Sequence, residues 1–213
     1  MSVDEPISET APKKHRRAFW ARARTTLHTL GFGVVLVLAA PKWPYVLAAL
    51  PLVAVGVALR IHALGYLRKD DHLCMAGPYA YVRNPLYLGN LFILAGVIVA
   101  GNSLYLTLFA VAQAVVVYVF TMRSEEAFLT ARFGEGYREY CRRVPRILPY
   151  RRRVARSGQR FSWALVRNNN AGEWSFWLGA LFAIVIAKSL LGPLTGLWPY
   201  HGAGPPLTWG LWW

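Results

Sequence analysis

Residues 86–122 read LYLGNLFILAGVIVAGNSLYLTLFAVAQAVVVYVFTM, and this stretch decides the fold. It holds two apolar runs, residues 86–100 and 104–122, with only Gly101-Asn102-Ser103 between them. A tight turn of small residues between two long apolar runs predicts a helical hairpin. Because a membrane-spanning helix needs about 20 residues, the first helix of the hairpin reaches that length only if it begins near Asn84 or Pro85.

Three more apolar runs lie outside the hairpin, at residues 27–40, 45–67 and 174–191. The first is short, follows a basic segment and ends in Leu38-Ala39-Ala40, so it also fits the apolar core of a cleaved signal peptide. If this run is counted as a helix, the chain has five candidate transmembrane helices. The sequence therefore predicts an all-α integral membrane bundle of about five transmembrane helices.

Charge placement gives the orientation of this bundle. The 213 residues combine 55% hydrophobic residues with 24 Lys and Arg against 10 Asp and Glu, a net charge of +14. When the five runs are threaded alternately through a bilayer, 22 of the 24 basic residues fall on the side of the N-terminus. Since Lys and Arg concentrate in cytoplasmic loops, we predict a multi-pass membrane protein with a cytoplasmic N-terminus, in the inner membrane if the cell is bacterial.

This topology divides the chain into four parts. Residues 1–26 form a basic cytoplasmic segment, residues 27–150 a membrane core, residues 151–173 a basic cytoplasmic linker, and residues 174–213 an extra transmembrane helix with an aromatic tail. Within the core, residues 125–133 and 135–142 are short amphipathic stretches separated by Gly134. They predict a cytoplasmic amphipathic helical segment after the hairpin.

The composition argues against two classes of partner. Two cysteines, Cys74 and Cys141, form no CxxC pair, and the five histidines show no ligand spacing such as HExxH, so no metal site is expected. The basic residues flank apolar helices instead of forming one soluble basic face, so nucleic acid is not the expected partner. The expected partners are the lipid bilayer and a lipophilic small molecule or lipid.

Two polar stretches meet on the predicted cytoplasmic side, residues 77–89 and Arg123-Ser124-Glu125-Glu126. Because the hairpin is tight, the start of its first helix lies beside the end of its second, which makes Arg83 a neighbour of the glutamate pair. Taken singly, each of these residues has an ordinary structural role. Together they suit S-adenosylmethionine: an Arg for its carboxylate, carboxylates for its ammonium and ribose hydroxyls, and tyrosine faces for its sulfonium.

The same residues resemble a known family. Gly77-Pro78-Tyr79-x-Tyr81-x-Arg83-Asn84-Pro85-x-Tyr87-x-Gly89 is similar to the hallmark of the isoprenylcysteine carboxyl methyltransferase and phospholipid methyltransferase group. Three later blocks resemble it too, Glu125-Glu126-x-x-Leu129, Phe133-Gly134-x-x-Tyr137-x-x-Tyr140 and Val144-Pro145-Arg146-x-Leu148-Pro149. The resemblance covers roughly residues 60–150 and implies a small helical membrane bundle with a cytoplasmic cofactor pocket.

Carried over position by position, the resemblance implies a set of site residues. The residues expected to bind S-adenosylmethionine are Tyr79, Tyr81, Arg83, Asn84, Tyr87, Gly89, Glu125, Glu126, Tyr137, Tyr140 and Arg146. Arg83, Glu125 and Glu126 are the residues expected to be needed for turnover. Many relatives have His where this chain has Asn84, so His-based proton transfer is not expected here.

The sequence thus predicts an integral membrane methyltransferase that transfers a methyl group from S-adenosylmethionine to a lipophilic acceptor. The shared blocks contain no acceptor-side residues, so a carboxylate such as that of prenylcysteine, an amine and a thiol all stay open, as does the oligomeric state. An alternative is a membrane NADPH-dependent reductase of the sterol or enone type, which shares a similar bundle. A third reading is an interaction module that keeps the scaffold without catalysis, because fold alone does not decide function.

Overall fold

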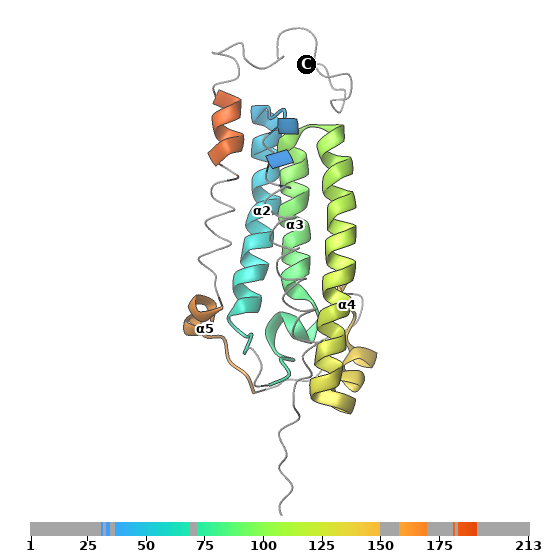
Figure 1. Cartoon of the computed structure of the whole chain (residues 1–213). Helices are drawn as coiled ribbons and strands as arrows, with labels where there is room; N and C mark the ends of the chain where they lie inside the picture. Colours follow the sequence, from blue (N-terminus) through green and yellow to red (C-terminus); the bar gives the residue numbers. More distant parts are fainter. Residues whose placement is uncertain are drawn as a thin grey trace, which may run out of the picture.

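The computed structural model describes residues 37–68, 72–149, 158–169 and 183–190, together with residues 31, 33, 34 and 181. This part of the chain is helical and contains no strand, which confirms the predicted all-α class (Figure 1). Its elements are α2 (Trp43–Leu64), the 3-10 helix η1 (Gly77–Ala80), α3 (Pro85–Gly101), α4 (Leu104–Arg143) and the short α5 (Trp163–Asn168). Residues 183–190 are also helical.

Two of these helices, α2 and α4, are long and apolar enough to cross a membrane, and α3 is apolar but shorter at 17 residues. Both long helices leave large apolar side chains exposed, as a lipid-facing surface would. These side chains include Leu47, Leu50 and Val55 of α2 and Leu108, Val115 and Val116 of α4. Half of each of the predicted runs 27–40 and 174–191 lies outside the described residues, so the count of five transmembrane helices stays a prediction.

The predicted hairpin is present, and its ends form where the sequence places them. Pro85 is the first residue of α3, a position where proline's missing N–H costs nothing. At the turn, Asn102 adopts a left-handed conformation with φ 44°, which Asn tolerates better than most residues. The Ser103 hydroxyl then accepts a hydrogen bond from the Leu106 N–H at 3.4 Å and caps α4.

Helices α2 and α3 pack closely because small residues face each other. A β-carbon on Gly56 would lie 2.6 Å from the Gly89 carbonyl oxygen, and one on Gly89 would lie 2.8 Å from the Gly56 carbonyl oxygen. Both positions therefore require glycine for the two backbones to approach this closely. The loop of Tyr79 to Asn84 directly precedes α3 and is therefore joined to this closely packed pair.

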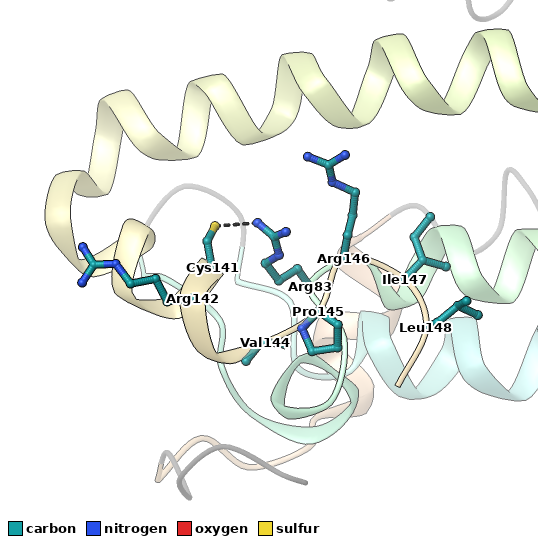
Figure 2. A pocket seen from close by; sticks show the side chains of 8 residues that line it. All are labelled: Arg83, Cys141, Arg142, Val144, Pro145, Arg146, Ile147 and Leu148. Atoms are coloured by element: carbon teal, nitrogen blue, oxygen red, sulfur yellow. Dashed lines mark hydrogen bonds between the residues drawn. The ribbon is translucent and has the colours of Figure 1, made fainter. Parts of the chain in front are cut away.

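Helix α4 differs from the prediction in its length. The apolar run ends near Met122 as expected, but the helix continues through Glu125 and Glu126 and is broken only at Gly134, with φ 54° and ψ −126°. The first amphipathic stretch is thus the end of the same helix, because nothing between residues 122 and 133 interrupts its hydrogen bonds. At Gly134 the chain turns, and the stretch that carries Cys141 runs back beneath α4 (Figure 2).

Candidate active site

Three segments meet at the end of the bundle opposite the α3–α4 turn: the connection between α2 and α3, the first turn of α3, and α4 from Glu125 onward (Figure 1). The Tyr87 hydroxyl of α3 donates a hydrogen bond to Glu125 Oε1 of α4 at 3.0 Å. The Tyr87 ring also meets the Tyr118 ring edge to face, with centroids 5.3 Å apart. These contacts confirm that the hairpin brings the two polar stretches together.

Arg83 and Glu126 are direct neighbours, as the sequence predicts. Arg83 Nη1 lies 3.3 Å from Glu126 Oε1, and only 13% and 14% of the two side chains is exposed. Arg146 approaches the same carboxylate and donates Nε to Oε1 at 2.9 Å and Nη2 to Oε2 at 2.5 Å. This hydrogen-bonded carboxylate raises the pKa of Arg146. The Glu126 carboxylate is therefore shared between Arg83 and Arg146, and it orients both guanidinium groups.

The backbone around Arg83 is held by the segment that follows α4. The Arg83 N–H donates to the Pro145 carbonyl at 2.8 Å, and the Asn84 N–H donates to the Arg146 carbonyl at 3.1 Å. The Asn84 side-chain amide reaches the same Arg146 carbonyl at 3.3 Å. From the end of α4, the buried Tyr140 hydroxyl donates to the Tyr79 carbonyl at 2.7 Å. The segment of residues 140–146 thus fixes the loop of Tyr79 to Asn84 by four hydrogen bonds.

A cavity of about 320 Å³ opens among these segments. This volume lies in the range of roughly 300–1,000 Å³ that small-molecule sites occupy. Seven residues that the sequence assigned to the site line it: Tyr79, Arg83, Asn84, Tyr87, Glu125, Tyr137 and Tyr140. Aromatic rings, two arginines and one carboxylate are therefore gathered around a single space, which suits a ligand with a cationic centre and separate anionic groups.

Two polar atoms in this region have no hydrogen-bond partner within the described part of the chain, Tyr79 Oη and Arg83 Nε, although both are buried. Burial also raises the pKa of Tyr79 well above its ordinary value. The phenol is thus a neutral donor in the cavity wall. Leaving a buried donor unsatisfied costs about 1–3 kcal/mol, so both atoms are suited to bind a ligand.

Four predicted site residues lie elsewhere. Tyr81 is 43% exposed and does not line the cavity. Gly89 lies at the contact with α2, against Gly56 and the Arg60 stem. Glu126 lies behind Arg83, outside the lining of the cavity. Arg146 lines a second, more open cavity of about 350 Å³.

Arg83 belongs to both cavities. In Figure 2 the Arg83 and Arg146 side chains extend toward α4, whereas Arg142 points away from them. Cys141 lies beside Arg83, and Arg83 Nη1 donates to its sulfur at 2.6 Å (Figure 2). Arg83 therefore lies between the cavity of about 320 Å³, called the aromatic cavity below, and the more open one.

Several cavity residues were missed by sequence reasoning. From the α2–α3 connection they are Leu67, Arg68, His72, Leu73 and Cys74, and from α4 they are Phe128, Leu129 and Phe133. The α4 residues follow Glu125 at helical spacing, so extending the α4 helix past Met122 would have placed them on the face of Glu125. The α2–α3 connection has no periodic signal, and nothing in its sequence indicates which side chains face inward. Burial raises the pKa of Cys74 to about 11.

Comparison with known proteins gives matches to the central segment of the chain. Residues 62–136 match the family model described as phospholipid methyltransferase. The chain is 36% identical over 92 residues to the protein-S-isoprenylcysteine O-methyltransferase of Schizosaccharomyces pombe, covering 41% of this chain and 38% of the relative. It is 38% identical over 79 residues to methanethiol S-methyltransferase 1 of Bradyrhizobium diazoefficiens, covering 36% of this chain and 26% of the relative.

A third relative is the cobalt-zinc-cadmium resistance protein CzcN of Cupriavidus metallidurans, 35% identical over 82 residues, with 38% of each chain covered. The chain therefore spans less than half the length of each of these curated relatives. No solved structure matches it. The resemblance predicted from the motifs is confirmed, and the two methyltransferases among these relatives favour methyl transfer over the reductase alternative.

Proposed function

We propose that this chain, whose residues 62–136 match the phospholipid methyltransferase family model, is a membrane methyltransferase that uses S-adenosylmethionine. The proposal rests above all on the aromatic cavity, in which Arg83 and Glu125 line one space with four tyrosines, Tyr79, Tyr87, Tyr137 and Tyr140. The bound cofactor supplies an activated methyl group. The chain itself supplies a shaped, partly dry site that holds donor and acceptor in line.

The residues present fit the cofactor group by group. Arg83 and the Asn84 amide are the donors for a carboxylate, and Arg83 Nε and Tyr79 Oη are buried donors that lack a partner in the described part of the chain. Glu125 is the acceptor in the cavity wall for an ammonium or a ribose hydroxyl. The tyrosine rings offer their faces to a sulfonium.

Glu126 and Arg146 support this site from behind. The Glu126 carboxylate holds the guanidinium of Arg83, and Arg146 holds Glu126. A one-ångström misplacement can slow a reaction that depends on alignment by about a hundredfold. We therefore assign Glu126 and Arg146 to positioning Arg83, and Arg83 and Glu125 to direct contact with the cofactor.

The acceptor is proposed to be lipophilic and to arrive from the bilayer. The exposed apolar surfaces of α2 and α4 suit a multi-pass protein with its cavity at the cytoplasmic surface and its N-terminus on the same side. The two methyltransferase relatives are named for methylation of oxygen and of sulfur. The proposal accordingly covers carboxylate and thiol acceptors, and amines as the family name suggests.

The proposal is tested with the whole chain, purified in detergent. Calorimetric titration should detect binding of S-adenosylmethionine, and membrane extracts incubated with methyl-labelled cofactor should yield a labelled lipophilic product. Arg83→Ala should weaken binding at least tenfold. Arg138→Ala is the matched control, because Arg138 is 62% exposed and pairs only weakly with Glu135 on the outer surface. Binding of NADPH instead of S-adenosylmethionine would overturn the proposal.

A further inference from the structure

Residues 158–169 lie within the segment predicted as a linker and beyond the end of the family match at residue 136. They nevertheless dock on the core, where α5 lies beside the C-terminal end of α2 (Figure 1). The contact centres on Asn169, a buried polar residue 105 positions away from the backbone it binds. Its Nδ2 donates to the Leu64 carbonyl at 3.2 Å and to the Leu67 carbonyl at 2.7 Å.

These hydrogen bonds bind backbone carbonyls at and just beyond the end of α2. Helix α2 ends at Leu64, whose carbonyl also accepts a hydrogen bond from the Leu67 N–H at 3.2 Å. Asn169 binds two carbonyls of the 64–67 turn, and the Ser162 N–H donates to a third, that of Gly65, at 2.9 Å. The segment 158–169 thus caps α2 from a distant part of the chain.

Side-chain packing makes this docking specific. The Phe161 ring lies edge to face against Tyr66, with centroids 5.9 Å apart, and 6.2 Å from the His62 ring. Gly65 has no side chain at the point of contact, and a β-carbon there would collide with the Phe161 ring. The 158–169 segment therefore fits one position on the end of α2.

The turn that Asn169 holds is also part of the cavity wall. Leu67 lines the aromatic cavity and packs against the buried cluster of Ala63, Cys74 and Tyr79. Tyr66, which contacts Phe161, accepts a hydrogen bond from the Cys74 thiol through its carbonyl at 3.3 Å. The contacts therefore run from Asn169 through Leu67 to Tyr79.

We propose that Asn169 is a positioning residue of the candidate active site, whose side-chain amide fixes the 64–67 turn and through it the wall formed by Leu67, Cys74 and Tyr79. This inference rests on the proposed function for its consequence, since a displaced wall binds S-adenosylmethionine less well. It also extends the functional unit beyond the family segment, to a part of the chain that contacts neither cavity directly.

The decisive variant is Asn169→Asp, which keeps the shape but replaces the donor amide with an acceptor facing two carbonyl oxygens. The matched control is Asn168→Asp, the same change at the exposed neighbouring position. In full-length protein in nanodiscs, Asn169→Asp should weaken binding of S-adenosylmethionine about tenfold, because two buried hydrogen bonds are lost. Asn168→Asp should change it less than twofold. Asn169→Gln, which retains a donor, should recover part of the affinity.

A second readout needs no cofactor. Cys74 is buried in the same wall, so its rate of alkylation reports whether the wall has opened. In a Cys141→Ser background, Asn169→Asp should accelerate alkylation of Cys74 at least fivefold over Asn168→Asp, at a temperature where circular dichroism shows both proteins folded. Equal rates and equal affinities in the two variants would overturn the inference.

The two readouts separate this inference from the proposed function. If the unmodified protein does not bind S-adenosylmethionine, the proposed function fails, and the alkylation rates alone decide the role of Asn169. If Asn169→Asp does not fold, Asn169→Ala replaces it, because it removes the amide donor to the Leu64 and Leu67 carbonyls without placing a charge against them. Faster alkylation of Cys74 in Asn169→Ala than in Asn168→Ala supports the inference, and equal rates overturn it.

Discussion

Arg146 donates two hydrogen bonds to the carboxylate of Glu126, from Nε to Oε1 at 2.9 Å and from Nη2 to Oε2 at 2.5 Å. The two residues are 20 positions apart in the sequence. A planar guanidinium matched to a carboxylate in this way is stronger and more directional than a single hydrogen bond. Since the same carboxylate holds Arg83, removal of Glu126 releases two arginines at once.

We therefore predict that Glu126→Ala destabilises the protein by about 2–3 kcal/mol, somewhat less than the ~3–5 kcal/mol typical of a fully buried pair, because Arg146 is half exposed. Binding of S-adenosylmethionine should fall by at least tenfold in the same variant. Thermal unfolding and calorimetric titration measure the two effects. Glu139→Ala is the control: its pairs with Arg142 and Arg143 are exposed, and exposed pairs contribute about 1 kcal/mol or less.

Substitutions of Tyr79 and of Tyr81 should differ sharply in their effect on ligand binding, although the two residues are only two positions apart. The Tyr79 hydroxyl is buried and has no partner in the described part of the chain, whereas Tyr81 is exposed. Tyr79→Phe should leave the ligand-free protein equally stable or slightly more stable, because an unsatisfied buried hydroxyl is removed. It should weaken binding of the cofactor or the acceptor roughly fivefold, the effect of about 1 kcal/mol. An equal loss of binding in Tyr81→Phe would contradict this assignment.

The sequence predicted the hairpin, its Pro85 start and the meeting of Arg83 with Glu126, because apolar runs and a short turn determine which helix ends are adjacent. It did not distinguish the side chains that face the cavity from those that do not. Tyr87 lines the cavity and Gly89 packs on α2, because residues two positions apart on an α-helix point about 200° apart around its axis. The order of residues in a motif does not show which of them share a face of the helix.

The contact of Asn169 with the 64–67 turn was beyond sequence reasoning for a different reason. It joins positions 105 residues apart, and no local pattern around Asn169 marks a long-range cap. Tyr137 and Tyr140, by contrast, were predictable as a pair, because residues three positions apart share one face of a helix. Both line the cavity.

Gly89 provides a test of its place in the structure. Its β-carbon would meet the backbone of α2 at the Gly56 carbonyl, so Gly89→Ala should force the helices apart and destabilise the protein by about 1–3 kcal/mol. Thermal unfolding in detergent should show a lower midpoint. Below that midpoint, binding of S-adenosylmethionine should change little. A large loss of affinity with an unchanged midpoint would instead support the cofactor-binding role that the motif suggests.

The Cys74 thiol should lose its proton only at a higher pH than an ordinary cysteine does. Burial raises its pKa to about 11, above the ordinary value near 8.5, so the folded protein favours the neutral thiol. Stability from this group is fully present below about pH 8.5 and is lost as the pH rises toward 11. Alkylation of Cys74 in a Cys141→Ser background should accelerate about tenfold per pH unit up to that range. The control is the unfolded chain in denaturant, whose rate should level off near pH 9.

Gly134 determines whether the segment after α4 can reach Arg83. Its φ of 54° and ψ of −126° lie in a region that is open to glycine and strained by about 1–3 kcal/mol for other residues. A β-carbon there would meet no atom within 4 Å, so the cost of Gly134→Ala is conformational. The substitution favours a continuous helix through position 134, which would carry Arg146 away from Glu126. We expect at least tenfold weaker binding of S-adenosylmethionine and faster proteolysis near residues 144–148.

The control is Gly136→Ala, because Gly136 lies in the helical stretch and also has no close contact. This substitution should be neutral or slightly stabilising. An equal loss of binding in both variants would show that the turn at Gly134 has no role.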